Sequence, residues 1–406
     1  MPGSARCVRS ALAAMAAVVL ISGAAPATAQ NVDWRPGFDA ILDENAVRTS
    51  RPILSPEIAA AMDLAILRYQ DIVSSGGWPV VPATETLRLG MDSPSVSVLR
   101  QRLIVSGDLV ASAGTSTIFD SYVEAAVRHF QARHGIPADG IVGPTTFSAL
   151  NVAAAMRLNQ LIINRDRLRE LAATTTPRYV MVNLPAAEIE AVEHGVVVSR
   201  HTAVVGKVDR PSPILTSQIH EINFNPFWTV PVSIIRRDLI PLMQQHPTYL
   251  RDQGIRIYTQ QGQEIMPEAV DWYSDEATRY VFRQDPGDLN SLGSVKINFH
   301  NPHAVYMHDT PNKTLFGNEY RFDSSGCVRV ENIRGLIVWL LRDNPGWDAT
   351  QINSVFMSGQ RIDVQLTSPV RLYFAYVTAW AMEDGVVNFR EDIYAMDGIG
   401  DVASLQ

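Results

Sequence analysis

Cysteine is scarce in this sequence, since only Cys7 and Cys327 occur among 406 residues. Cys7 lies in an N-terminal stretch with two arginines, an apolar run over residues 11–25 and small residues at 27–29. This pattern is typical of a secretory signal peptide that is cleaved after Ala29. The exported chain would keep Cys327 alone, so a disulfide within the mature chain is excluded.

Long apolar runs and basic clusters are lacking as well. The run over residues 11–25 is shorter than the ~20 residues of a transmembrane helix, although an uncleaved anchor stays the alternative, and no later segment offers a span. Removal of Arg6 and Arg9 would shift the formal net charge from −8 to −10, and such an acidic chain does not indicate nucleic-acid binding. The absence of low-complexity tracts and the 46% hydrophobic content indicate a globular protein of two or three domains.

The first part of the sequence is expected to be helical. Residues 56–73 have a proline at the start and apolar residues at helical spacing. In residues 119–135, Asp120 or Ser121 is the predicted N-cap and Gly135 is the predicted stop. Further helices are predicted within residues 87–109, at the end of 136–151 and over 151–171.

Beyond Pro177 the apolar period changes from that of helices to that of strands. Strands are predicted over residues 178–184, 187–206 with a turn at His194-Gly195, 220–228, 294–300 and 303–310. Over residues 235–292 the strand pattern gives way to a helical pattern. An insertion of this size in a β-rich domain is typical of a lid or an interaction surface. A helix is predicted over residues 332–343, and a hairpin over residues 370–392 that turns at Asp384-Gly385.

The remaining thiol lies in the stretch RFDSSGCVRVEN, residues 321–332. An unpaired cysteine in an oxidising compartment is an intermolecular bridge, a buried inert thiol or a reactive group. Small residues before Cys327 leave room for a substrate, and Arg329 lies two positions beyond it. A thiol is nucleophilic only as thiolate, so it needs a base or a cationic neighbour. The setting favours a catalytic cysteine.

Histidines near the thiol are the candidate bases. In the predicted strand 303–310, side chains alternate between two faces, so Val305 and Met307 share the core face while Tyr306 and His308 share the other. His308 is therefore the predicted base. The remaining candidates, His220, His300 and His303, are less well placed.

Zinc chemistry is the competing interpretation. His300, His303 and His308 could be imagined as the three ligands of a catalytic zinc. However, His300 and His303 flank a turn at Asn301-Pro302, no HExxH pattern occurs, and a cysteine ligand would not act as a nucleophile. We therefore predict no metal and no cofactor.

Residues 86–151 resemble the three-helix peptidoglycan-binding domain of many cell-wall enzymes. The resemblance rests on the order and spacing of Leu-Arg-Gln-Arg-Leu at 99–103, Ala126-Val127, Phe130-Gln131, His134-Gly135, Asp139-Gly140 and Gly143-Pro144-Thr145. Taken one by one, these residues are expected to be core or turn positions. The resemblance implies a module that docks on the wall, or one that only scaffolds a neighbouring domain.

The arrangement Tyr-x-His, loop, Ser-x-Gly-Cys-x-Arg resembles the catalytic motif of the L,D-transpeptidases, over about residues 178–384. With the module and the insertion, the chain looks most like the large periplasmic type of Gram-negative bacteria. Many members of the family have histidine directly before the Gly-Cys pair and asparagine two positions after it, where this chain has Ser325 and Arg329. We interpret this departure as the mark of a subtype. It leaves the partner that orients His308 unidentified, and a backbone carbonyl is the expected one.

The resemblance implies roles for individual residues. Cys327 attacks the carbonyl of a peptide stem, His308 carries the proton, and the backbone N–H groups of Gly326 and Cys327 stabilise the oxyanion. Arg329 binds a substrate carboxylate and lowers the thiol pKa, unless it forms a surface ion pair with Glu331 or Asp323.

Three further residues are expected to bind the substrate. Tyr306 donates to the oxyanion or positions the stem, Ser325 contacts the substrate, and Trp228 lines the cleft or is merely a buried aromatic beside a strand.

The predicted fold class is α+β, with a β-rich catalytic domain, a helical inserted cap, a three-helix module and scaffold helices. The expected segments are a signal peptide (1–29), a helical scaffold (30–85), the module (86–151), a connector helix (152–177), the catalytic domain (178–385, with the cap at 235–292) and a tail (386–406). The resemblance implies a periplasmic, carbapenem-sensitive enzyme that cross-links peptidoglycan stems and has no stable membrane span after cleavage. Hydrolysis of the same acyl-enzyme, or a non-catalytic wall-binding scaffold, are the alternatives.

Overall fold

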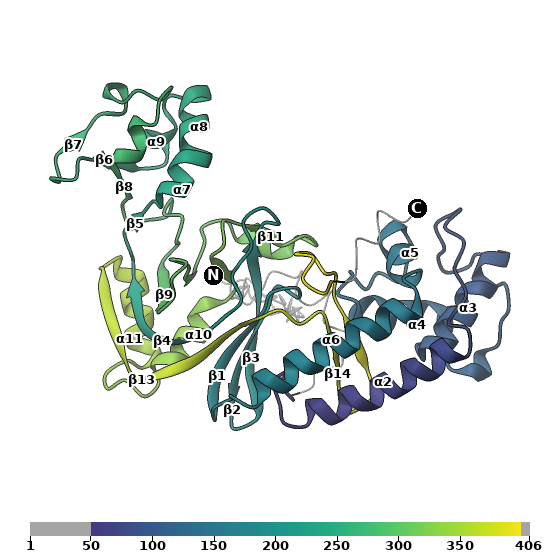
Figure 1. Cartoon of the computed structure of the whole chain (residues 1–406). Coiled ribbons are helices and arrows are strands. Elements are labelled where there is room, and N and C mark those ends of the chain that lie inside the picture. Colours follow the sequence, from purple (N-terminus) through teal and green to yellow (C-terminus); the bar gives the residue numbers. More distant parts are fainter. Residues whose placement is uncertain (1–49, 399–406) are drawn as a thin grey trace, which may run out of the picture. The chain divides into compact units, whose positions relative to one another are not determined.

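The computed structural model describes residues 50–398. The predicted signal peptide, residues 30–49 of the N-terminal scaffold segment and the last eight residues of the chain lie outside this range. Helices and strands are both present, as the predicted α+β class requires (Figure 1).

A nine-stranded sheet forms the centre of the catalytic region, in the order β11-β3-β12-β10-β9-β4-β13-β1-β2. The last strand of this order, β2, also pairs with β3, so the sheet closes on itself. Its strands are β1 (Arg178–Asn183), β2 (Glu188–Glu193), β3 (Val196–Gly206), β4 (Leu215–Phe224), β9 (Val295–Phe299), β10 (Met307–His308), β11 (Phe322–Ser324), β12 (Val328–Val330) and β13 (Ile362–Ala375).

Alternating side chains give β1 and β13 two buried faces. Val180 and Leu372 point into the core inside the closed sheet, which α10 (Ile333–Leu341) and α11 (Ala349–Ser358) also fill. Tyr179 and Tyr373 point the other way, into a second core shared with α2 (Ile58–Ser74) and α6 (Ala154–Ala172). These two helices lie side by side in Figure 1.

The helical module has a core of its own, contributed by α3 (Pro94–Ser106), α4 (Ser121–Arg133) and α5 (Pro144–Leu150). Asp120 is the N-cap of α4, and its carboxylate accepts hydrogen bonds from two backbone N–H groups of the first turn. The Gln131 side chain bonds Asp139 Oδ1 at 2.8 Å and accepts from the Gly140 N–H at 2.9 Å. Gln131 of the sequence pattern thus stabilises the turn at Asp139-Gly140.

The insertion contains a small sheet besides its helices, which the sequence analysis missed. Four strands pair in the order β5-β8-β6-β7 beside short helical segments (Figure 1). The segments are β5 (Trp228–Thr229), α7 (Val232–Ile234), the π-helical turn η2 (Ile235–Leu239), α8 (Ile240–Gln245), α9 (Tyr249–Asp252), β6 (Ile255–Tyr258), β7 (Glu264–Ile265) and β8 (Val281–Gln284). Strands of two to four residues are too short for a clear period-two pattern.

Three predicted strands differ from the structure. The strand expected over residues 220–228 is divided between β4, which ends at Phe224, and β5, which begins at Trp228. The strand expected over residues 303–310 is regular only at Met307–His308, because the preceding residues turn through Ala304, which has a φ of 54°. The hairpin expected over 370–392 is confined to β14 (Ala379–Ala381) and β15 (Val387–Phe389), while residues 370–375 belong to β13. This hairpin turns at Asp384-Gly385 as predicted, so residues 387–389, the start of the predicted tail segment, form its second strand.

Candidate active site

Cys327 and His308 lie on adjoining parallel strands that present the same face. In the β10–β12 ladder, Met307 pairs with Val328 and His308 with Arg329, and the Val328 N–H donates to the Tyr306 carbonyl at 3.1 Å. Met307 and Val328 are fully buried in the core. Because side chains alternate along a strand, the residues on either side of these two project from the opposite face of the sheet. Tyr306, His308, Cys327 and Arg329 therefore share one surface.

The loop before the thiol is fixed by two serine hydroxyls. Ser212 Oγ donates to the Gly326 carbonyl at 2.8 Å, and Ser324 Oγ donates to the Cys327 carbonyl at 2.5 Å. Gly326 has a φ of 110°, a conformation that side chains other than glycine rarely adopt. Glycine directly before the nucleophile is thus required by the turn.

The Gly326 N–H, predicted as one of two oxyanion donors, has a partner within the loop in this structure. Its N–H donates to Ser324 Oγ at 3.1 Å, so this group is already used within the loop. Sequence spacing gives no indication of such a local bond, because it depends on the side-chain rotamer of Ser324.

Ser325 is exposed, and its Oγ accepts from Arg210 Nη1 at 3.0 Å. The Arg210 guanidinium also binds both carboxylate oxygens of Asp238, at 2.6 and 3.0 Å. Asp238 lies in η2, so Arg210 connects the insertion to the residue that precedes the Gly-Cys pair. Neither Arg210 nor Asp238 was singled out from the sequence.

A backbone carbonyl orients His308. The His308 Nδ1 lies 2.5 Å from the carbonyl oxygen of Asp309, so this nitrogen is the donor and Nε2 is left to accept a proton. The Asp309 carboxylate accepts from the Ser294 N–H and hydroxyl at 3.0 and 2.8 Å and pairs with Lys313. The sequence analysis did not single out Asp309, although it directly follows the predicted base.

Burial controls the protonation of the pair. It raises the pKa of the Cys327 thiol to about 11, and the opposing effects of Tyr306, Lys296 and Arg329 do not cancel it. Burial, and next the charge of Arg329, lower the pKa of His308 to about 3. Arg329 lowers the pKa of the thiol, as expected, but by less than burial raises it. Both groups are neutral at pH 7, so the site without substrate holds a thiol and an imidazole and not an ion pair.

Arg329 is half-buried, and burial lowers its pKa. Asp323, one of its two candidate surface partners, pairs with Lys207 at 3.4 Å. Within residues 50–398, no carboxylate lies within the 4.0 Å of an ion pair from the Arg329 guanidinium. The guanidinium is therefore available to a ligand.

Tyr306 and Trp228 meet beside the thiol. Trp228 Nε1 donates to the Tyr306 hydroxyl at 3.2 Å, which brings the first strand of the insertion to the site. Burial raises the pKa of Tyr306, and the charge of Cys327 raises it further, so its hydroxyl stays protonated. The Tyr306 and His308 rings are in edge contact, with centroids 5.6 Å apart.

The other histidines lie apart from this pair. His300 stacks on His220 with ring centroids 4.1 Å apart, and His303 is exposed. Among the residues that the structure describes, no three His, Cys, Asp or Glu side chains are grouped so as to hold a metal ion. No helix in the same range is both long and apolar enough to cross a membrane.

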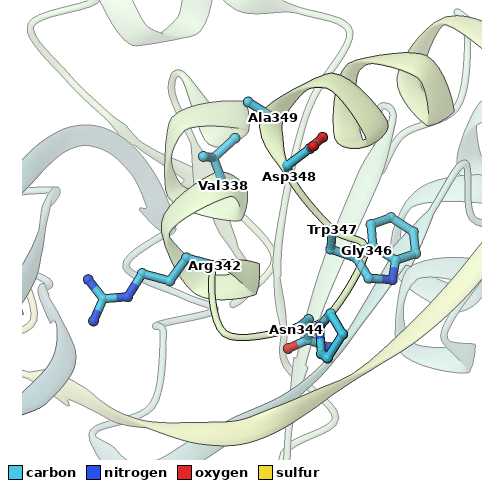
Figure 2. A pocket seen from close by; sticks show the side chains of 8 residues that line it. Val338, Arg342, Asn344, Gly346, Trp347, Asp348 and Ala349 are labelled. Atoms are coloured by element: carbon cyan, nitrogen blue, oxygen red, sulfur yellow. The ribbon is translucent and has the colours of Figure 1, made fainter.

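A pocket of about 430 Å³ lies elsewhere, in the connection from α10 to α11 (Figure 2). None of the predicted site residues lines it. Its lining residues are Val338, Arg342, Asn344, Pro345, Gly346, Trp347, Asp348 and Ala349.

A thiol, an oriented imidazole and a guanidinium share one sheet face, and a thiol with an oriented base is the pair that nucleophilic catalysis by cysteine requires. The family described as "L,D-transpeptidase catalytic domain", of the YkuD type, matches residues 177–355, and the family described as "Putative peptidoglycan binding domain" matches residues 92–150. Residues 177–355 thus match an L,D-transpeptidase catalytic domain, and residues 92–150 match a peptidoglycan-binding domain. Both resemblances found in the sequence are confirmed.

A curated relative from Haemophilus influenzae, named "Putative L,D-transpeptidase", is 34% identical over 239 residues. The match covers 59% of this chain and 48% of the relative, so the chain spans about half the relative's length. Among solved structures, an L,D-transpeptidase from Xylanimonas cellulosilytica is 16% identical, with 72% of this chain and 99% of the other covered and a TM-score of 0.24. One from Stackebrandtia nassauensis is 15% identical, with 72% and 96% covered and a TM-score of 0.24. Scores of this size are too low to relate the folds in detail.

Proposed function

We propose that this protein is a peptidoglycan L,D-transpeptidase that forms a thioester on Cys327. The observation that carries the proposal is that Cys327, His308 and Arg329 share one sheet face. The pairing of His308 with Arg329 in the β10–β12 ladder establishes this face. Its large-type architecture and cleaved signal peptide are part of the same proposal, which assigns the enzyme to the periplasm and the cell wall.

The proposed reaction has two steps. In the first, the Cys327 sulfur bonds to the stem carbonyl carbon, the C–N bond to the terminal D-alanine breaks, and His308 passes the thiol proton to the leaving amine. In the second, an amine of a neighbouring stem attacks the thioester, the C–S bond breaks, and the amine proton returns to the sulfur through His308. Cys327 N–H and the Tyr306 hydroxyl are the proposed oxyanion donors.

The proposed substrate contacts are made by side chains around the thiol. Arg329 binds the carboxylate of the donor stem through its planar fork. Trp228, which is held against Tyr306, covers the bound stem from the insertion. Ser325 contacts the substrate at the edge of the site, where its side chain is exposed.

Mass spectrometry with a disaccharide-tetrapeptide tests the proposal. The mature protein should gain the acyl stem without D-alanine on Cys327, and a carbapenem should label the same residue. Added acceptor stems should convert the adduct into dimers, whereas tripeptide release would assign the protein as a hydrolase. Turnover by the Cys327→Ala variant would refute the assignment, and binding of stems without any adduct would indicate a scaffold protein.

The helical module is proposed to dock on the glycan. Residues 86–151 enclose a core of their own, so they can be tested as a separate segment. If they bind glycan, this segment alone should sediment with purified sacculi. If this segment stays in solution while the full chain sediments, the module is a scaffold for the catalytic domain.

A further inference from the structure

Lys296 occupies the third strand of the catalytic face. In the antiparallel β9–β10 ladder, Lys296 pairs with His308 and Ile297 with Met307. Ile297 and Met307 are both fully buried, so Lys296 projects from the same face as His308. One row across the sheet therefore contains Arg329, His308 and Lys296 in register.

The surroundings of Lys296 differ from those of the other lysines. The sequence contains three lysines, and the other two, Lys207 and Lys313, have side chains 44% and 55% exposed and form ion pairs with Asp323 and Asp309. Lys296 is half-buried, and its Nζ lies 4.4 Å from the centroid of the Tyr306 ring. In residues 50–398 no carboxylate approaches this ammonium within the 4.0 Å of an ion pair.

The nearest acidic side chains on this face are engaged by amides. Glu221, on β4, accepts from Asn298 Nδ2 at 2.9 Å and from Asn223 Nδ2 at 2.6 Å. Asp363, on β13, accepts from Asn223 Nδ2 at 2.8 Å and from Arg361 at 2.6 Å. These carboxylates act on Lys296 only at a distance, and the charge of the ammonium stays available to the thiol.

We propose that Lys296 is a positioning residue that stabilises the thiolate of Cys327 and holds the Tyr306 ring by a cation–π contact. It acts through these two residues and does not itself touch the substrate. The proposal rests on the proposed function, because it assigns to Lys296 the stabilisation of the nucleophile. Its physical basis is that a cation near a thiolate in a desolvated site gains far more energy than in water.

The charged groups around the thiol agree with this role. Burial lowers the pKa of Lys296, and ionisation of Cys327 is the first of the effects that oppose burial, ahead of Glu221 and Asp363. Lys296 and Arg329 both lower the pKa of Cys327, and neither offsets its burial alone. His308 is neutral near pH 7, since burial lowers its pKa to about 3. Lys296 and Arg329 are thus the two cations that favour ionisation of the thiol.

Alkylation of Cys327 by iodoacetamide tests this role without any substrate. Its rate follows the thiolate fraction, so a rise of the thiol pKa by about one unit in Lys296→Met should slow alkylation at pH 8 about tenfold. Lys296→Arg keeps the charge and should retain most of the wild-type rate. The matched control is Arg371→Met, which removes a half-buried cation 5.6 Å from the Tyr373 ring on β13 and should leave alkylation unchanged.

Steady-state kinetics separate this role from substrate binding. Lys296→Met should lower kcat with little change in KM, whereas a ligand of the substrate carboxylate would raise KM. A folded Lys296→Met protein with wild-type alkylation would overturn the proposal even if the enzyme is a transpeptidase. If this variant does not fold, Lys296→Gln replaces it in the same assay. Absence of any thioester in the wild type, with alkylation still dependent on Lys296, would instead refute the proposed function alone.

Discussion

His308 and Arg329 are direct neighbours across the parallel β10–β12 ladder, with the guanidinium on the same face as the imidazole. This neighbour is the second cause, after burial, of the lowered pKa of His308. The same arrangement places a cation beside the imidazole and adds to the effect of burial, which keeps His308 unprotonated at neutral pH. Binding of a carboxylate at Arg329 would reduce this effect and raise the basicity of His308 when the substrate is present.

The pH dependence of thiol alkylation should show a neutral pair. With a thiol pKa of about 11 and a histidine pKa of about 3, the rate should climb about tenfold per pH unit from pH 6 to 9, without a plateau. Iodoacetamide is suitable because it is uncharged. A thiolate–imidazolium pair would instead give a plateau across neutral pH, and observing one would contradict the assigned protonation states.

Acid should destabilise the fold partly through His308. The unfolded histidine takes up a proton below its ordinary pKa of 6.5, whereas the folded one stays neutral until about pH 3. Its contribution to stability is therefore complete above pH 6.5 and is lost as the pH falls. The His308→Asn variant can still donate to the Asp309 carbonyl. Between pH 7 and pH 4, its free energy of unfolding should fall by on the order of 2–3 kcal/mol less than that of the wild type.

Denaturant unfolding at both pH values measures this difference. The exposed His303 provides the matched control, because His303→Asn should leave the acid sensitivity unchanged. Some sensitivity should persist in His308→Asn, since burial also lowers the pKa of His134. Equal pH dependence in wild type and His308→Asn would show that His308 is not held neutral by the fold.

Replacing Arg329 by lysine should separate charge from geometry. The ammonium keeps the positive charge but cannot bind a carboxylate with two parallel bonds. Loss of one charged hydrogen bond, about 1.5–3 kcal/mol, should lower kcat/KM for the tetrapeptide roughly 10- to 100-fold. Alkylation of Cys327 should change little, because the charge near the thiol stays. Unchanged kcat/KM would remove Arg329 from the substrate site.

Gly326→Ala should strain the turn before the nucleophile. A methyl group has space there, since its nearest neighbours are 3.6 Å away, but the φ of 110° costs a non-glycine residue about 1–3 kcal/mol. Thermal unfolding should show this loss, and thioester formation should slow because the thiol shifts. Gly195→Ala is the control, because it imposes a positive φ of 77° in the β2–β3 turn. It should lower stability without changing Cys327 reactivity, and equal effects of both variants on reactivity would exclude a special role for Gly326.

Local patterns in the sequence determined much of the fold. Periodicity and caps predicted the helices now seen as α2 to α6 and α10, and period-two alternation placed Val305 and Met307 in the core with His308 on the other face. These inferences depend on neighbours within a few residues along the chain. The unpaired cysteine and its upstream histidine predicted the nucleophile and base of the proposed function, and the structure places both on one sheet face.

Tertiary structure decided which strands lie beside one another. Lys296 was visible as a polar position in a strand, but only the β9–β10 register brings it to His308. The small sheet of the insertion and the Arg210–Asp238 contact depend on segments far apart in sequence. Protonation was also beyond the sequence, because desolvation of Cys327 exceeds the effect of the cation two residues away. Pairing register and burial are properties of the folded chain, and local sequence patterns do not encode either of them directly.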